Sequence, residues 1–420
     1  MGKAARDNRP RLRPVQKIEL SEKHLGLRAV LAIVFLAIGL AALGWGLYAV
    51  LRTEAGWTVI ESDNAGIDCS EEIQFTYFIG QADKSRTAEK KELVALYTEE
   101  VGRINRLLSI YENTTGLHNL YYINHHVGEE IVVDEALYEA FEQIERADSR
   151  VLFAAPYYPS YRDLCFSDNE PTASLFDPYR DAETAAYFHA LADFVTSEEA
   201  VRLELLGNCT VRLHVSEAYQ AFATQHEIDA YIDFNRYKNA FVVDHLASVL
   251  TEAGKTLGYL SSYDGFTRNL DRSGNSYSLN LFDKEGTAIY PVSTLTYEGP
   301  MSLVYVRTYP MAQKDTDYFF VYEDGTATTP YVAPNGEWKA ATDSYVSYSS
   351  ERTCAEILLA TLPAVLADEF DASIFREAKE DGIYSVWYGV ATLYYNDASV
   401  TLSPLYETED VRYQKFLVED

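Results

Sequence analysis

The chain has 420 residues, with 35 basic and 64 acidic side chains and a formal net charge of −29. So acidic a chain is not expected to bind nucleic acid or an anionic membrane surface, since both are polyanions. None of its four cysteines forms a C-x-x-C pair, which argues against a structural zinc site.

The amino terminus carries a basic segment followed by an apolar one. Residues 1–28 hold eight basic and three acidic side chains, a net charge of +5. Residues 29–51 form an uncharged run of 23 residues, and a helix of that length, at about 1.5 Å per residue, spans a bilayer. The run is longer than the apolar part of a signal peptide, and no clear cleavage site closes it. The sequence therefore predicts a cytoplasmic tail and a transmembrane helix.

The remaining chain is expected outside the cytoplasm, because the positive-inside rule keeps the basic tail in it. Nucleic-acid binding by the tail is an alternative, but topology control explains its charge more simply. Residues 52–70, which are small and polar and lack strong periodicity, predict a stalk. Residues 71–420 contain no repeat or low-complexity break and predict one large domain. We expect a single-pass cell-membrane protein with an extracytoplasmic domain.

The domain combines one strong helical pattern with several strand patterns. Apolar residues recur at spacings of three and four between Leu93 and Tyr111, which predicts an amphipathic helix. Residues 303–306, 318–322 and 383–388 are rich in β-branched and aromatic side chains, which favours strands. The predicted class is α+β, with helices packed on antiparallel sheet.

Residues 229–268 read as a short strand, a tight turn, an amphipathic helix and a second strand that ends in a polar turn. In this frame Asp233, Phe241, Asp244 and Asp264 stand at the spacing of an Asp, a Tyr and two further Asp residues in the signature of the FAD:protein FMN transferase family. The stretch resembles that signature, and four earlier blocks match in the same order: residues 107–111, 122–124, 128–138 and 153–164. The resemblance extends from about residue 73 to residue 370. It implies the fold of the family, FAD as a ligand and magnesium as a metal.

Both glycine pairs of the family signature are replaced in this chain. Asn235 and Arg236 stand at the first pair, and Ser262 and Tyr263 stand at the second. Glycine turns bring backbone N–H groups against a pyrophosphate, whereas an arginine meets a phosphate through its planar guanidinium. The lysine of the family falls on Asn239, and Lys238 lies one position earlier. The resemblance therefore implies a cofactor site at Asp233, Arg236, Lys238 and Asp264.

The metal-binding motifs of the family are also altered. Ala333 stands where the family carries an aspartate, and the aligned metal pair near the C-terminus is Ala355 and Leu359. A frame moved by one residue gives Glu356 and Ala360. Glu356 is thus the one candidate metal ligand in this region, and a single relocated carboxylate rarely supplies the near-octahedral oxygen ligation that magnesium demands. The segment 324–328 resembles flavinylation targets only loosely, with a different spacing, and does not predict covalent flavin.

Two functions follow from the resemblance. The first is a catalytically degenerate family member that acts as an extracytoplasmic binding or assembly module beside flavinylated or electron-transfer membrane proteins. The second is a divergent, magnesium-dependent transferase that attaches FMN to a Thr or Ser of a partner. FAD and magnesium are its implied cofactors; for the first function, neither is required.

Site geometry is expected to separate the two functions. An open cleft that converges on Arg236, Asp264 and Glu356 favours the enzyme. The binding module is favoured by a cleft that is filled by tyrosine side chains, namely Tyr237, Tyr263 and Tyr331. Up to two disulfides are possible among the cysteines, and the sequence does not choose between their pairings.

Overall fold

The computed structural model describes residues 25–51, 54–63, 68–285, 288–311, 319–328, 331–338, 344–366, 370–389, 391–407 and 412–419. The chain divides into two compact units, Met1–Glu54 and Ala55–Asp420. The predicted single large domain is therefore confirmed as the second unit. In the first, the described residues form one helix, α1 (Leu25–Leu51). Counted over the residues that are described in full, no helix combines the length and apolar character needed to cross a membrane.

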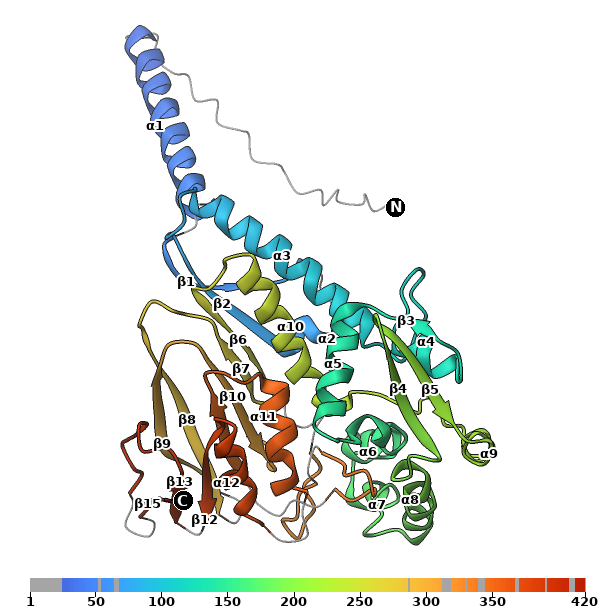
Figure 1. Ribbon diagram of the computed structural model, residues 1–420. Helices are drawn as coiled ribbons and strands as arrows, with labels where there is room; N and C mark the ends of the chain where they lie inside the picture. Colours follow the sequence, from blue (N-terminus) through green and yellow to red (C-terminus); the bar gives the residue numbers. More distant parts are fainter. Residues whose placement is uncertain are drawn as a thin grey trace, which may run out of the picture. The chain divides into compact units, whose positions relative to one another are not determined.

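The second unit is built on one long sheet, which has nine strands among the described residues (Figure 1). Its neighbours pair antiparallel, apart from the parallel pair β13–β15. In spatial order the strands are β1 (Gly56–Ile60), β2 (Ile73–Ile79), β6 (Gly258–Ser262), β7 (Phe266–Asn269), β10 (Met301–Arg307), β11 (Ser344–Ser349), β12 (Tyr384–Gly389), β13 (Thr392–Tyr395) and β15 (Gln414–Leu417).

Both faces of the central strands are buried, in two separate cores. In β10, Val304 and Val306 join the larger core, whereas Leu303 and Tyr305 join the smaller one. Because successive side chains of a strand point to opposite faces, a strand between two layers reads as a continuous apolar run. This explains why residues 303–306 lack polar alternation.

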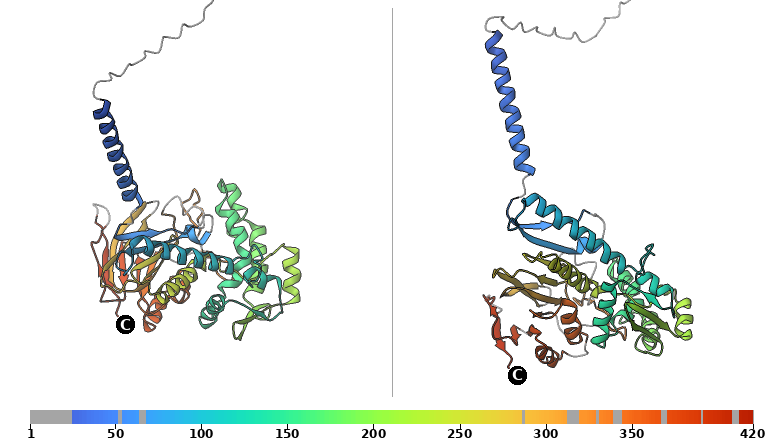
Figure 2. Two further views of the ribbon diagram at one scale, coloured as in Figure 1. Left: turned by 90° about the horizontal axis from the view of Figure 1, so that it is seen from above. Right: turned by 45° about the horizontal axis from the view of Figure 1, so that its top comes forward.

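Helices cover the face with the larger core, and a small sheet covers the other. The described helices on the first face are α3 (Arg86–Leu107), α10 (Lys238–Glu252), α11 (Cys354–Thr361) and α12 (Ser373–Glu380), with α2 (Asp68–Glu72) beside α3 and the 3-10 turn η4 (Leu362–Ala364) after α11. The small sheet is β14 (Thr401–Leu402), β9 (Ala288–Glu298) and β8 (Ser276–Glu285). Figure 2 shows α3 and α10 side by side. The predicted mixed class is confirmed.

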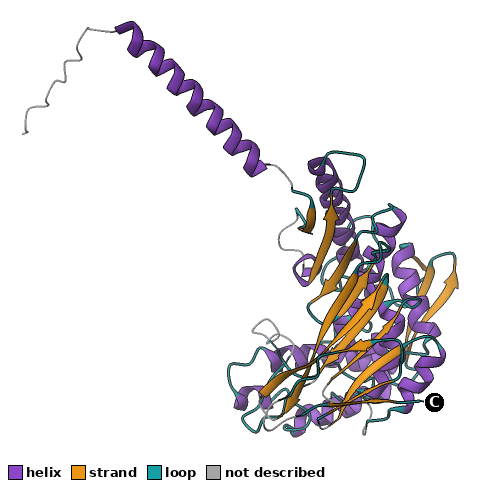
Figure 3. Ribbon diagram, turned by 90° about the vertical axis from the view of Figure 1, so that its left-hand side faces the viewer, coloured by secondary structure: helices purple, strands orange, loops and turns teal. Residues whose placement is uncertain are grey.

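A second group of elements lies beside the main sheet, between α3 and α10 in the sequence. It contains the three-stranded sheet β3 (Ile131–Val132), β5 (Thr210–Val215) and β4 (Val201–Gly207), together with several helices that Figure 1 labels beside that sheet. Figure 3 colours helices and strands by type and shows that both are present throughout the second unit. The helices are α4 (Leu120–His125), α5 (Glu135–Arg146), η1 (Val151–Tyr157), α6 (Tyr158–Cys165), α7 (Glu170–Ser174), α8 (Ala182–Val195) and α9 (Glu217–Gln225). We call this group the helical lobe.

Two sequence predictions need correction. The predicted stalk, residues 52–70, contains β1, which pairs along its full length with β2 and so belongs to the folded unit. A five-residue strand is too short to give a periodic signal in the sequence. Residues 319–328 form a hairpin with one isolated bridge, Val321 to Ala327, rather than a strand at 318–322. Tyr318 itself lies outside the described residues.

None of the four cysteines, all of which lie in the described part of the chain, forms one of the disulfides that the sequence allowed. Cys69, Cys165 and Cys354 are buried, and Cys69 is part of the larger core rather than of a stalk. Cys209 is partly exposed in the turn between β4 and β5, where its φ of 54° is left-handed.

Candidate functional site: a cleft at the 233–239 turn

A cleft of about 1700 Å³ opens between the helical lobe and the start of α10. Its inner wall is the turn that leads into α10, through the short 3-10 helix η2 (Asn235–Tyr237), and the turn between β6 and β7. The structure brings Asp233, Arg236, Lys238 and Asp264 together in this wall. Four residues that were chosen from the sequence thus line one cleft.

The first turn is anchored from the helical lobe by the side chain of Asn124. Its Oδ1 accepts hydrogen bonds from the backbone N–H groups of Tyr231 (2.8 Å) and Ile232 (3.0 Å), and its Nδ2 donates to the Ile232 carbonyl (2.9 Å). Asn124 is buried, so this pairing satisfies a polar group that burial would otherwise penalise. The backbone N–H of Asp233 then donates to the Leu152 carbonyl at 3.0 Å. Together these bonds fix where Asp233 enters the cleft.

Asp233 is a weaker acid than an ordinary aspartate. Burial raises its pKa to about 6, although the Asn235 backbone and the Lys238 charge lower it. The Lys238 Nζ lies 3.6 Å from the Glu72 carboxylate, which also lines the cleft. The Arg236 guanidinium lies 6.0 Å from the centre of the Tyr161 ring. The turn therefore presents two cations and an acid that titrates near neutrality.

Asp264 faces this turn from the β6–β7 connection. Its Oδ2 accepts a hydrogen bond of 2.9 Å from the Asn239 amide, and burial raises its pKa to about 6. Asp264 Oδ1 and Asn239 Oδ1 are both buried and have no hydrogen-bond partner. At Gly265, φ is 109° and an added Cβ would lie 2.2 Å from the Tyr305 carbonyl, so this turn requires glycine.

The tyrosines expected to fill the cleft do not line it. Tyr237 and Tyr331 are buried with ring centres 5.5 Å apart, and the Tyr237 hydroxyl donates to the Val332 carbonyl at 3.3 Å. Tyr263 is exposed and does not line the cleft, although it follows Ser262 in the turn. The cleft is thus open, as expected for the enzyme, and Arg236 and Asp264 lie in its wall, but Glu356 does not.

The structure places Glu356 outside the cleft lining, at the start of α11. Its Oε2 accepts from the Thr353 backbone N–H at 2.9 Å, while the Thr353 hydroxyl accepts from the Glu356 N–H at 3.2 Å. This is a capping box. Asp244 serves the same helix: its two oxygens accept from Cys354 N (3.0 Å) and Ala355 N (2.8 Å).

Across the described ranges no group of three or more His, Cys, Asp or Glu side chains is arranged to hold a metal ion. The aligned metal pair, Ala355 and Leu359, is buried in the larger core. Glu356 is held by backbone groups and lies 4.0 Å from the Arg352 guanidinium. A metal role for Glu356 stays a prediction.

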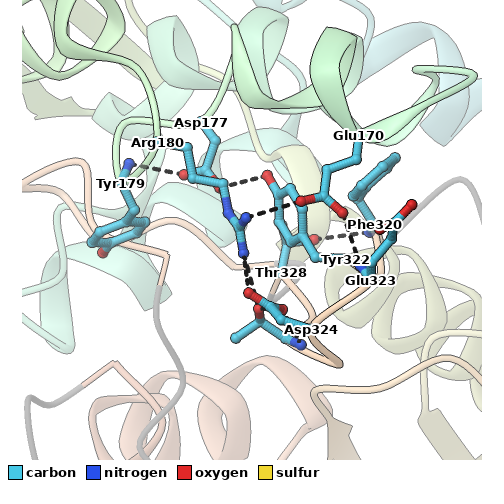
Figure 4. Close-up of polar contacts among 10 residues, drawn as sticks. Glu170, Asp177, Tyr179, Arg180, Phe320, Tyr322, Glu323, Asp324 and Thr328 are labelled. Atoms are coloured by element: carbon cyan, nitrogen blue, oxygen red, sulfur yellow. Dashed lines mark hydrogen bonds and ion pairs between the residues drawn. The ribbon is translucent and has the colours of Figure 1, made fainter.

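A second polar cluster holds the hairpin 319–328 against the helical lobe (Figure 4). Arg180 is its centre: the guanidinium pairs with Glu170 (3.2 Å) and Asp324 (2.7 Å), and it lies 3.5 Å over the Tyr322 ring. The Tyr322 hydroxyl donates to Asp177 at 2.5 Å. These contacts join segments about 144 residues apart, so nothing in the local sequence pattern indicates them.

Segment 331–338 packs against residues that line the cleft. Its Trp338 packs edge-on against Tyr161. The Tyr158 hydroxyl accepts from the Val332 N–H at 3.4 Å. Burial raises the pKa of Tyr158 above its ordinary value, so this hydroxyl stays uncharged at neutral pH.

Comparisons with known proteins give a fold and no sequence family. No family model matches the chain, and no curated protein matches it. Among solved structures, the ApbE protein of Thermotoga maritima superposes with a TM-score of 0.53 at 13% identity, over 79% of this chain and 94% of that one. A mutant of the flavin transferase ApbE from Vibrio cholerae (TM-score 0.48, 12% identity, 83% and 97% covered) and the flavinyl transferase ApbE from Pseudomonas stutzeri (0.47, 13%, 80% and 91%) are also similar.

Proposed function

We propose that this chain, which has a flavin-transferase-like fold, is a membrane-anchored binding and assembly module outside the cytoplasm. In this proposal the cleft binds a nucleotide such as FAD, and the protein does not carry out metal-dependent FMN transfer. Its partners would be flavinylated or electron-transfer membrane proteins, as the resemblance implies.

The observation that carries the proposal is how the two carboxylates at α11 are used. Asp244 accepts two backbone N–H bonds and an ion pair from Arg268 at 2.6 Å, and Glu356 closes the capping box. These bonds fix the direction of both carboxylates, whereas magnesium demands a near-octahedral set of oxygen ligands, and among the described residues no group of three His, Cys, Asp or Glu side chains gathers here. The donor set at α11 therefore does not fit a magnesium ion.

The cleft itself fits a nucleotide. Its volume of about 1700 Å³ exceeds the roughly 300–1000 Å³ of a typical small-molecule site. Arg236 and Lys238 offer cationic donors for phosphate oxygens, and the buried Tyr161 ring lies beside Arg236. FAD would supply an FMN group, and these residues would bind and orient it.

Membrane anchoring is supported by the composition of α1. Among its described side chains, Ile33, Phe35 and Leu36 are exposed and apolar. Exposed aliphatic and aromatic side chains in such a row are unfavourable in water and favourable in a bilayer. With the basic residues of the segment 1–28 kept in the cytoplasm, the large domain would lie outside.

A divergent transferase is the second candidate, and the pKa values of Asp233 and Asp264 favour it. An acid with a pKa of about 6 can accept a proton from a Thr or Ser hydroxyl and still be ionised at neutral pH. Arg236 and Lys238 would hold the phosphates. The hydroxyl oxygen would bond to the FMN phosphorus, and AMP would leave.

Calorimetry on the full-length chain in lipid nanodiscs separates the two candidates. FAD is titrated with magnesium and, in parallel, with a chelator. The module predicts the same affinity in both conditions and no AMP release. Binding that requires magnesium, together with AMP release in the presence of a Thr-containing acceptor, would establish the transferase. No heat at millimolar FAD would overturn the nucleotide site.

A further inference from the structure

The mouth of the cleft carries large apolar side chains that water surrounds. Tyr111 is 74% exposed, Phe166 is 61% exposed and Leu175 is 59% exposed, and all three line the cleft. They come from three separate places: the connection after α3, the end of α6 and the end of α7. Exposed apolar groups that gather around one concavity are typical of a protein-binding surface.

The charge of the cleft wall is negative. Seven acidic and three basic side chains line it, and the acidic excess lies toward the helical lobe, where Glu183, Glu227 and Asp229 are exposed. Among the described lining residues of the helical lobe, Arg162 is the one Lys or Arg, and its guanidinium lies 3.9 Å from the Asp163 carboxylate. Such a wall attracts a cationic ligand and repels a second acidic surface.

The inner wall differs from this acidic side of the cleft. Arg236 and Lys238 line it, and the proposed function assigns them to phosphate oxygens. A basic ligand side chain is therefore expected at the mouth and on the side of the helical lobe, and not at the inner wall.

We propose that the cleft binds an extended segment of a partner polypeptide in which lysine or arginine alternates with apolar residues. Phe166 and Leu175 contact the apolar side chains at the mouth, and Asp229 and Glu227 attract the basic ones. The inference rests on the proposed binding function and names its partner chemistry. A small free cation would satisfy the acidic side chains but would leave the apolar side chains at the mouth exposed to water.

Fluorescence anisotropy on the full-length chain in nanodiscs of zwitterionic lipid tests this. The probe is a labelled pool of twelve-residue peptides in which lysine or arginine alternates with leucine or phenylalanine. A second pool carries glutamate at the basic positions. The basic pool is expected to bind, and the acidic pool is not. Equal binding of the two pools, or no binding of the basic pool, would overturn the proposal.

Variants locate the binding. Phe166→Ser with Leu175→Ser should weaken the basic pool by at least about tenfold, and Asp229→Lys by roughly fivefold to tenfold. Val132→Ser is the matched control, because Val132 is exposed to a similar degree and does not line the cleft. An unchanged affinity in the double variant places the peptide elsewhere and contradicts the inference.

The FAD titration is repeated on the double variant, so that the two proposals fail separately. Retained FAD binding with lost peptide binding supports both. If the wild-type chain does not bind FAD but the double variant loses peptide binding as expected, the nucleotide site alone is overturned. FAD binding without any response to the basic pool overturns the peptide segment alone.

Discussion

The inner wall of the cleft and the start of α11 both hold carboxylates, but the hydrogen bonding of these groups differs. At α11, Asp244 accepts from two backbone N–H groups and pairs with Arg268, and Glu356 accepts from one backbone N–H. In the cleft, Asp264 has one oxygen without a partner. Burial raises the pKa of Asp244 and also those of Asp233 and Asp264, the latter two to about 6. A raised pKa therefore does not by itself mark a functional acid, and the bonds that each carboxylate already makes have to be compared as well.

Among the substitutions that test this contrast, Asp244→Ala is expected to have the largest effect. The substitution leaves Cys354 N and Ala355 N without acceptors and the Arg268 guanidinium without its ion pair, so we expect a loss of about 3–5 kcal/mol in the free energy of unfolding. Urea denaturation measures it. Asp244→Asn keeps one acceptor and should lose less. A loss below about 1 kcal/mol would mean that α11 does not depend on this carboxylate.

Arg236→Ala is expected to weaken FAD binding by roughly 10- to 100-fold, because a hydrogen bond from a charged donor contributes about 1.5–3 kcal/mol. Calorimetry at fixed ionic strength gives the affinity. Arg202→Ala is the control, since Arg202 is exposed on β4 and does not line the cleft. Equal affinity in wild type and Arg236→Ala would remove this turn from the nucleotide site.

Asp264→Asn should stabilise the domain at pH 7.5 by roughly 1–2 kcal/mol. The folded pKa of about 6 lies above the ordinary value of 3.8, so the folded chain binds this proton more tightly than the unfolded chain. The resulting contribution to the free energy of unfolding is fully present below pH 3.8 and is lost as pH rises through 6. The variant therefore gains at pH 7.5 and equals wild type at pH 3.5. Thermal unfolding at the two pH values checks this, and a destabilised variant at pH 7.5 would reverse the sign.

The smallest expected effect is that of Glu356→Ala. Loss of the capping box should cost about 1 kcal/mol of stability, with FAD affinity unchanged. Glu356→Gln should restore most of the stability, because an amide oxygen also accepts from the Thr353 N–H. Any magnesium-dependent step that Glu356→Ala abolishes and Glu356→Gln does not restore would return this residue to a metal site.

Much of the fold could be predicted because it depends on local pattern. The helix at α3 and the strands at β10 and β12 follow from periodicity and β-branched content. The helix ends at Leu107, however, so the predicted pattern was too long at Tyr111, which is exposed beyond it. Asp233 and Asp264 were predicted from their spacing, which matches the family signature. The structure brings them together because α10 and β6 are the main elements between them in the sequence. The true extent of the fold was missed at β1, where five residues carry no period.

For Glu356, the sequence comparison shifted by one residue gave a metal ligand, whereas the local sequence pattern indicates a helix cap. The sequence Thr353-x-x-Glu356 before an apolar run is itself the signature of a capping box, and this signal favours a structural role. The bonds from Asn124 to residues 231–232 and from Arg180 to Asp324 join positions more than 100 residues apart. A single sequence gives no information about such pairs, because their partners meet only through the tertiary fold.

The cysteines have a practical consequence for following this protein. Three of the four thiols are buried, and Cys209 in the β4–β5 turn is partly exposed. A maleimide dye or nitroxide should therefore attach to the native chain at one position without any engineering. A reporter there sits in the helical lobe, which supplies one side of the cleft, and so provides a spectroscopic signal for movements of that lobe when a ligand binds.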